Sequence, residues 1–351
     1  MWRTNLAADY LLPYEIVATL EGIYSLDINS PLAANINTNE PTQRLNNPHN
    51  YPYWESSGAY YDNNAFTDVI LLTNINEGYY ASLTAELSKG LGEYGNARVA
   101  YTRSVSKDYG LIGGSQAASL WPNVVVDDRN NPEIGFSRFD QPNRLIAQLS
   151  LNTRALGNRL NTNVSIIYDG GERGRYSYTY SGRFNDGAQR LMYIPNSIQD
   201  AYLVDKTVDG EVMTAAQQWA ILDEFISQDP YLSNNRGSVA ERNGGKFPWQ
   251  HRFDLRIAQD FMIQAGANRY KLQGFLDVLN VGNLINNEWG VGETSVQNNL
   301  MNFEGVDGSG NGMFTINNIP GTSDFPTTTY RPIFALSQTW SAQIGIRLSF
   351  N

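Results

Sequence analysis

The chain ends with WSAQIGIRLSFN, residues 340–351, in which apolar and polar side chains alternate. An alternation of period two is typical of a β-strand whose two faces meet different surroundings. Those surroundings are a core and water in a soluble sandwich, or lipid and an aqueous lumen in a membrane barrel. A strand that crosses a membrane needs about 9–11 residues, and this segment is long enough. The apolar positions are Trp340, Ala342, Ile344, Ile346, Leu348 and Phe350.

Earlier segments repeat this pattern, some of them less regularly. In each, apolar residues face one way, and residues such as Glu21, Arg98, Arg144, Asp254 and Arg347 face the other. A wall that separates lipid from a lumen needs this division on every strand. The segments with this alternation are 14–28, 79–88, 97–106, 144–152, 160–168, 252–261 and 270–279.

The connections between these segments alternate between short and long. Outer-membrane barrels have short periplasmic turns and long extracellular loops. A soluble sandwich has no reason to place a loop of more than 30 residues at every second connection. The pattern therefore predicts an all-β, antiparallel transmembrane barrel. The short connections lie near Pro13 and at 89–95, 154–158 and 265–269, and the long ones at 29–66, 107–141, 170–250 and 281–335.

The amino-acid composition narrows the range of possible functions. The chain has 351 residues, no cysteine, and only His49 and His251 as histidines, so thiolate metal sites are excluded and histidine-based catalysis is poorly supplied. A formal charge of −10 disfavours nucleic-acid binding. No apolar run is long enough for a membrane helix, but alternating strands leave no such run. The 21 tyrosines and 7 tryptophans suit the aromatic girdles of a barrel.

The strand count predicts how the chain is oriented. If the short turns are periplasmic, the last strand runs toward the periplasm, and an odd count makes the first strand run the same way. A complete barrel of this type has an even number of strands and begins in the periplasm. We therefore expect an incomplete part of a larger barrel, without its signal peptide. The nine expected strands are 3–11, 14–28, 67–88, 96–106, 142–153, 160–169, 252–264, 270–280 and 337–350.

One long connection contains an expected helix, residues 213–228. Thr214 and Gln217 have the spacing of a capping box. Trp219, Leu222 and Phe225 share one face with Ile226. The pattern favours a helix that packs on its own loop, and a lid that grips a ligand is the alternative.

Four stretches resemble one family. LQGFLDVLNVGNLINNEWG (272–290) is similar to the penultimate-strand motif of TonB-dependent outer-membrane receptors of the Oar-like group. LMYIPNS (191–197) and RNGGKFPWQHRFDLRIAQDF (242–261) match the order and spacing expected there, and QIGIRLSFN (343–351) resembles the terminal strand. Together these stretches make the resemblance run through roughly the whole chain.

The resemblance implies a 22-stranded barrel filled by an N-terminal plug, in the outer membrane of a Gram-negative bacterium. It implies energised uptake of a ligand, with the inner-membrane TonB complex, the barrel assembly machinery and outer-membrane lipid as partners. The assembly signal would be Trp340, Ile344, Ile346, Leu348 and Phe350. The chain departs from the family because it contains no plug or TonB box, and because Asn351 follows the terminal aromatic residue.

A candidate calcium loop lies in DGSGNGMFTINN, residues 307–318. Asp307, Ser309 and Asn311 occupy positions 1, 3 and 5, and Gly312 occupies position 6. Oxygen ligands at alternate positions and a glycine for the turn are features of a calcium loop. Asn318 at position 12 cannot supply the bidentate carboxylate, so a flexible extracellular loop is the favoured interpretation. No other cofactor is expected.

Aromatic residues of the long loops are candidate ligand contacts: Tyr176, Tyr178, Trp219 and Trp249. Tyr176 and Tyr178 lie in the basic, aromatic stretch 171–180, although such residues also furnish the interface belt. The polar-face carboxylates and arginines are best explained as lumen charges that pair with one another and with water.

Three functions remain for such a chain. The first is the wall and outer loops of a TonB-dependent receptor for an unidentified ligand. The second is an adhesion or secretion-associated barrel that binds a protein or glycan through its loops. A secreted β enzyme is disfavoured because no catalytic constellation is present in the sequence.

Overall fold

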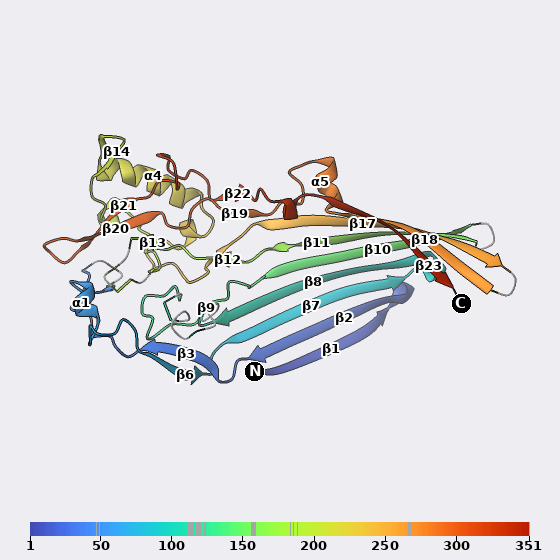
Figure 1. Ribbon diagram of the computed structural model, residues 1–351, viewed down its shortest axis with the longest axis horizontal. Helices are drawn as coiled ribbons and strands as arrows, with labels where there is room; N and C mark the ends of the chain where they lie inside the picture. Colours follow the sequence, from blue (N-terminus) through green and yellow to red (C-terminus); the bar gives the residue numbers. More distant parts are fainter. Residues whose placement is uncertain are drawn as a thin grey trace.

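The computed structural model describes residues 1–350 except 47, 49, 111–115, 117–120, 123, 156–158, 183, 185, 188 and 266–267, and only the backbone of 155, 265 and 269. Within these residues, nine long strands form one antiparallel sheet in the order β1-β2-β7-β8-β10-β11-β17-β18-β23 (Figure 1). The short β9 (Gly135–Phe136) pairs with β8. β1 and β23 are the two edges, and within the described residues no pairing joins them.

Each long strand has between 10 and 17 residues. The strands are β1 (Trp2–Leu12), β2 (Ile16–Leu26), β7 (Tyr79–Gly90), β8 (Gly95–Asp108), β10 (Asn143–Ala155), β11 (Leu160–Glu172), β17 (Trp249–Ala265), β18 (Asn268–Leu279) and β23 (Ser341–Phe350).

The predicted antiparallel strands are confirmed, with bounds that differ by up to three residues in several strands and with two larger differences at strand starts. Residues 67–88 are not one strand: β6 (Ile70–Ile75) leaves the sheet to pair with β3 (Ser30–Asn35), and β7 begins at Tyr79. Gly78 lies between the two strands and packs closely on Asp27, since a β-carbon at 78 would lie 2.3 Å from a carboxylate oxygen of Asp27. The last strand begins at Ser341 instead of 337, because the 3₁₀ turn η4 (Leu336–Gln338) precedes it.

The register places most apolar positions on one face of the sheet, which we call the apolar face, and most charged positions on the other, the polar face. Ile344 lies opposite Leu276, and Leu276 lies opposite Ile257. Arg347 lies opposite Gln273 on the polar face, as its place in the alternation predicts. The sequence thus assigned the two faces correctly.

All connections at one end of the sheet are short, and all at the other end are long (Figure 1). The short end has the 3₁₀ turns η1 (Pro13–Glu15) and η2 (Gly92–Tyr94). Residues 156–158 and 266–267 of the other two short connections lie outside the described residues. β1 starts at the long-connection end and β23 finishes at the short end, which agrees with the predicted strand directions.

The long connections 27–78, 109–142, 173–248 and 280–340 build a second body, here called the cap. The large hydrophobic core of the described residues lies in the cap and not under the sheet. Tyr178, Ile194, Ile226 and Leu232 are fully buried there. The apolar face of the sheet is exposed by contrast, with Leu6 and Ile344 each 81% accessible.

The cap contains short strands and helices. They are β4 (Gln43–Arg44), β5 (Pro52–Tyr53), α1 (Ser57–Tyr60), β12 (Arg175–Tyr176), β13 (Tyr180–Ser181), α3 (Ile198–Ala201), β14 (Lys206–Val208), β15 (Glu211–Met213), α4 (Ala215–Gln228), η3 (Leu232–Asn234), β16 (Gly245–Lys246), α5 (Val281–Ile285), β19 (Glu293–Ser295), β20 (Met301–Val306), β21 (Gly312–Ile316) and β22 (Tyr330–Pro332).

The predicted helix is α4, and its capping box between Thr214 and Gln217 is present. Leu222, Phe225 and Ile226 are buried in the cap core, so the helix packs on its own loop as predicted. No helix in the described part of the chain has both the length and the apolar character to cross a membrane.

Candidate functional site

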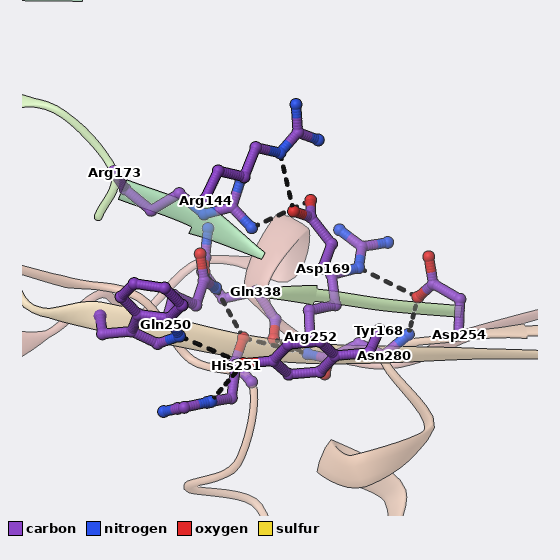
Figure 2. Close-up of polar contacts among 12 residues, drawn as sticks. Arg144, Tyr168, Asp169, Arg173, Gln250, His251, Arg252, Asp254, Asn280 and Gln338 are labelled. Atoms are coloured by element: carbon purple, nitrogen blue, oxygen red, sulfur yellow. Dashed lines mark hydrogen bonds and ion pairs between the residues drawn. The ribbon is translucent and has the colours of Figure 1, made fainter. Parts of the chain in front are cut away.

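The candidate site is a polar cavity of about 620 Å³ at the long-connection end of the polar face. Its floor comes from β11 and β17, and its opposite wall comes from the chain between β18 and β23. Its lining includes charged groups from both sides, among them Asp169, Arg173, Arg252, Asp254 and Glu293. Figure 2 shows Asp169, Arg173, Arg252 and Asp254 of this lining together with Arg144.

Strand register brings the charged residues together. Asp169 of β11 lies directly opposite Arg252 of β17. Arg144 of β10 lies opposite Gly171, two residues along β11 on the same face. Antiparallel pairs on one face have their side chains about 5 Å apart, so three strands contribute to one cluster.

Asp169 holds two arginines. Its Oδ1 accepts a hydrogen bond from Nε of Arg144 at 3.0 Å, and its Oδ2 accepts one from a terminal nitrogen of Arg173 at 3.2 Å. Nε of Arg252 donates to Oδ1 of Asp254 at 3.0 Å. Within the described residues, each of the three guanidinium groups donates only this one hydrogen bond. Arg173 and Arg252 line the cavity, and all three arginine side chains are partly exposed to solvent.

The opposite wall is held by amide groups. The backbone N–H of Asn280, a residue in the left-handed region with φ 52°, donates to Asp254 at 2.7 Å. Gln250 donates to the carbonyl of Gly290 at 2.7 Å and to Gln338 at 3.0 Å. Gly290 has φ +67° and packs against the Asn280 amide, where a side chain would clash. These contacts fasten the connection to the strand ends.

Asn280 leaves one polar atom unsatisfied. Its side chain is 97% buried, its Nδ2 donates to the carbonyl of Gln338, and its Oδ1 has no hydrogen-bond partner in the described structure. A buried acceptor without a donor is uncommon in a folded protein, and it calls for a water or a ligand. Asn280 is one of the residues that line the charged cavity, and its Oδ1 lies beside Gly290 in that wall.

A second cavity, of about 340 Å³, lies within the cap and is lined by Arg44, Asp127, Arg129 and Asp186 among others. Burial raises the pKa of Asp127 to about 6, although Arg190 nearby opposes the shift. Arg190 is fully buried, bonds Asp186 at 2.6 Å, and also donates to the Asp127 carbonyl. This cavity is walled by residues that hold the cap together.

The four predicted ligand contacts lie in different places. Tyr176 and Tyr178 are buried in the cap core, so their rings pack and do not form a loop surface. Trp219 is half-buried against the same core. Trp249 lies at the start of β17, where its indole N–H donates to the hydroxyl of Tyr168 at 3.2 Å. The structure does not bring the four together.

Trp249 and His251 belong to the apolar face, in a cluster with Tyr168 and Phe253. The Tyr168 hydroxyl bonds Nδ1 of His251 at 2.8 Å, and the Tyr168 and Phe253 rings are 4.9 Å apart. The strand boundary expected at His251 is thus inside β17, which begins at Trp249. His49 lies outside the described residues.

The candidate calcium loop is the turn between β20 and β21. Oδ1 of Asp307 accepts the backbone N–H groups of Ser309 and Asn311 at 2.8 and 2.9 Å, and Oδ2 accepts the Asn311 side chain at 2.9 Å. These hydrogen bonds from Asn311 lower the pKa of Asp307. The carboxylate therefore organises the turn, and calcium binding stays a prediction. Within the described residues, no group of three or more histidine or acidic side chains could hold a metal.

The predicted assembly signal lies at the sheet edge. Ile344, Ile346, Leu348 and Phe350 are exposed on the apolar face of β23, and Trp340 is exposed just before the strand. Asn351 lies outside the described residues. The arrangement offers an apolar edge, and recognition by an assembly machinery stays a prediction.

No family model, curated protein or solved structure matches this chain.

Reasoning from sequence considered Arg144, Arg252 and Asp254 as separate lumen charges and did not single out Asp169 or Arg173. The signal that could have joined them is strand pairing. β11 and β17 are antiparallel neighbours in which Tyr168 lies opposite Phe253. Asp169 follows Tyr168 and Arg252 precedes Phe253, so the two charged residues also lie opposite each other.

Proposed function

We propose that this chain forms part of the barrel wall and outer loops of a TonB-dependent receptor of the Oar-like group, in the outer membrane of a Gram-negative bacterium. The observation that carries the proposal is the exposed apolar face that continues over all nine long strands. A water-soluble protein rarely exposes an apolar patch of more than a few hundred Å². Contact with lipid would remove this apolar face from water.

Two rows of aromatic residues on the apolar face support the same assignment. Near the long connections, the Trp2, Tyr24 and Tyr79 rings follow one another with centroids 6.3 and 6.5 Å apart. Toward the short turns lie Tyr10 and Phe261, both exposed. Trp2 and Tyr10 are eight residues apart on one strand, or about 26 Å. Rows at this separation suit the two interfaces of an outer membrane.

The charge pairs of the polar face support the proposal that this face lines an aqueous lumen. Its charges are paired across and along the strands, as in Arg98 with Glu86 at 2.8 Å and Arg256 with Asp277 at 2.8 Å. Paired charges of this kind are stable beside water but costly beside lipid. The two open edges of the sheet, β1 and β23, support a barrel with more strands, such as the 22-stranded barrel that the resemblance implies.

The membrane assignment is tested with single cysteines, because the chain has no native cysteine. In β10, Gln148→Cys and Asn152→Cys on the polar face should react with a water-soluble maleimide in membranes. Leu149→Cys and Leu151→Cys, their neighbours on the apolar face, should resist it and instead be reached by a lipid-soluble reagent. Equal reaction of all four, or a protein that stays soluble without detergent, would contradict the proposal.

Transport is tested in cells that carry the complete gene. Deletion of the gene should remove uptake of the ligand, and loss of TonB should have the same effect, because TonB energises the receptor through its plug. If TonB has no effect and the cells instead lose attachment to a protein or glycan surface, the long connections serve adhesion and the transport proposal fails.

A further inference from the structure

The charged cavity combines donors and acceptors in a way that specifies a ligand. Arg173 and Arg252 line it, and a guanidinium group has five N–H donors, of which each uses one in the described structure. The two terminal nitrogens of Arg252 are both unused, since only its Nε reaches Asp254 (Figure 2). That free pair matches the two oxygens of a carboxylate.

The arginines lie on the strand side of the cavity, whereas Glu293 lies on the opposite wall. Arg144, Arg173 and Arg252 face Asp169 and Asp254, so three positive charges meet two negative ones, a sum of +1. With Glu293 on the opposite wall, three positive and three negative charges balance, so the cavity suits a ligand that has an anionic group at one end and N–H donors beside it. The three arginine side chains are 43%, 32% and 33% exposed, so an incoming group can reach them.

The opposite wall of the cavity presents hydrogen-bond acceptors, so a ligand there needs N–H or O–H donors. Asn280 contributes a buried side-chain oxygen without a partner, and Glu293 contributes an exposed carboxylate. A simple anion leaves these acceptors unsatisfied, whereas a ligand with N–H groups next to its carboxylate satisfies both walls. The C-terminal end of a peptide has this arrangement of groups.

We propose that the cavity binds the carboxylate of a peptide-like ligand, with the carboxylate on Arg173 and Arg252 and the adjacent N–H groups on Asn280 and Glu293. Arg144 acts through Asp169, which it shares with Arg173, and is therefore a positioning residue. The inference deepens the proposed receptor function by naming the ligand class. Its own test is a binding measurement, whereas the receptor proposal is tested by labelling and uptake, so either can fail alone.

The test uses the purified full chain in detergent micelles and isothermal titration calorimetry at low ionic strength, where charge contacts are least screened. The probes are triglycine, triglycine amide and inorganic phosphate. Triglycine should bind at least roughly tenfold more tightly than its amide, the effect expected from one charge-assisted contact. It should also exceed phosphate, which offers oxygens but lacks amide donors. Binding of triglycine no tighter than that of its amide or of phosphate, or no binding of triglycine, would overturn the proposal.

Variants of the two walls give effects of opposite sign. Arg252→Gln and Arg173→Gln should each weaken triglycine binding by roughly tenfold. Asp169→Asn removes a negative charge and frees two guanidinium groups, so it should strengthen binding several-fold. A purely structural role for Asp169 predicts the reverse.

Arg98→Gln is the matched control. Arg98 lies on the same face, pairs with one carboxylate, and lies outside the cavity. Its variant should bind triglycine as the parent chain does. A loss as large as that of Arg252→Gln would mean that general charge, and not this cavity, accounts for binding, and the proposal would fail.

Discussion

Gly345 of β23 lies directly opposite Phe275 of β18, and the Phe275 ring occupies the space that a side chain at 345 would take. A β-carbon at 345 would lie 2.2 Å from the ring. The same ring lies under Arg256, whose guanidinium carbon is 4.8 Å from the ring centroid and which bonds both oxygens of Asp277. The glycine in the C-terminal strand therefore makes room for a packed polar-face cluster.

Gly345→Val should weaken the pairing of β18 with β23. The added side chain must displace the Phe275 ring, and overpacking of this kind costs about 1–3 kcal/mol. Urea unfolding in detergent micelles, followed by tryptophan fluorescence, measures the loss. Phe275→Ala in the same chain should recover part of it, because the space is then free. Gly274→Ala is the control, since nothing lies within 4 Å of its β-carbon position, and it should change stability little.

Arg242 joins the cap to the sheet. It is almost fully buried, bonds Oδ1 of Asp108 at 3.0 Å, and also donates to the Asp108 carbonyl. Arg242→Met leaves the partly buried Asp108 without its partner, and such a loss costs about 3 kcal/mol or more. We expect faster protease cleavage of the cap while the strands stay protected. Arg154→Met breaks an exposed pair with Glu93 and should cost less than about 1 kcal/mol. Equal effects of the two variants would contradict the role given to Arg242.

The strands and their faces could be predicted because alternation is a local property of the sequence, and it does not depend on which strand is the partner. Pairing is not local, and this is where prediction failed. Residues 70–75 (ILLTNI) are rich in apolar and β-branched residues and were joined to the alternating segment 79–88, yet they pair with β3, in which Leu32 lies opposite Thr73. The regular alternation begins only at Tyr79, but the partner of the apolar stretch before it could not be read from residues 67–88 alone.

The candidate site depended on the same missing information. Asp169 and Arg252 are adjacent only because β11 pairs with β17 across a long connection. The tyrosines of 171–180 were predicted as loop contacts, since long polar loops are usually exposed. They are buried because four connections fold together into a cap, and the partner of Tyr178 is Asp229, 51 residues away.

Tyr178→Phe should destabilise the cap without changing ligand binding. Asp229 is fully buried and accepts the Tyr178 hydroxyl, the Thr329 hydroxyl at 2.8 Å, and the backbone N–H groups of Tyr231 and Leu232. Burial raises the pKa of Tyr178 far above its usual range, so the hydroxyl stays protonated and donates. Its removal should cost about 1.5–3 kcal/mol.

Thermal unfolding of the cap measures that loss. Tyr53→Phe is a matched control, because Tyr53 is only partly buried at the edge of the same core and should cost less. If Tyr178→Phe leaves stability unchanged but weakens triglycine binding, the earlier prediction of Tyr178 as a ligand contact stands and its structural role is wrong.

The stability of the cap should fall as pH rises from about 4 to 6. Burial raises the pKa of Asp127 from 3.8 to about 6, so between these values the folded chain holds a proton that the unfolded chain has lost. The stabilisation is fully present below about pH 4 and is lost as pH rises through about 6, with a total of about 3 kcal/mol at most. Asp127→Asn mimics the protonated side chain and should flatten this part of the profile. Asp128→Asn, at an exposed neighbouring carboxylate, should change the profile far less, because the charge of Asp128 is only a minor cause of the raised pKa of Asp127. If stability instead rises with pH over this range, and Asp127→Asn leaves the profile as it is, Asp127 is not the origin of the pH dependence.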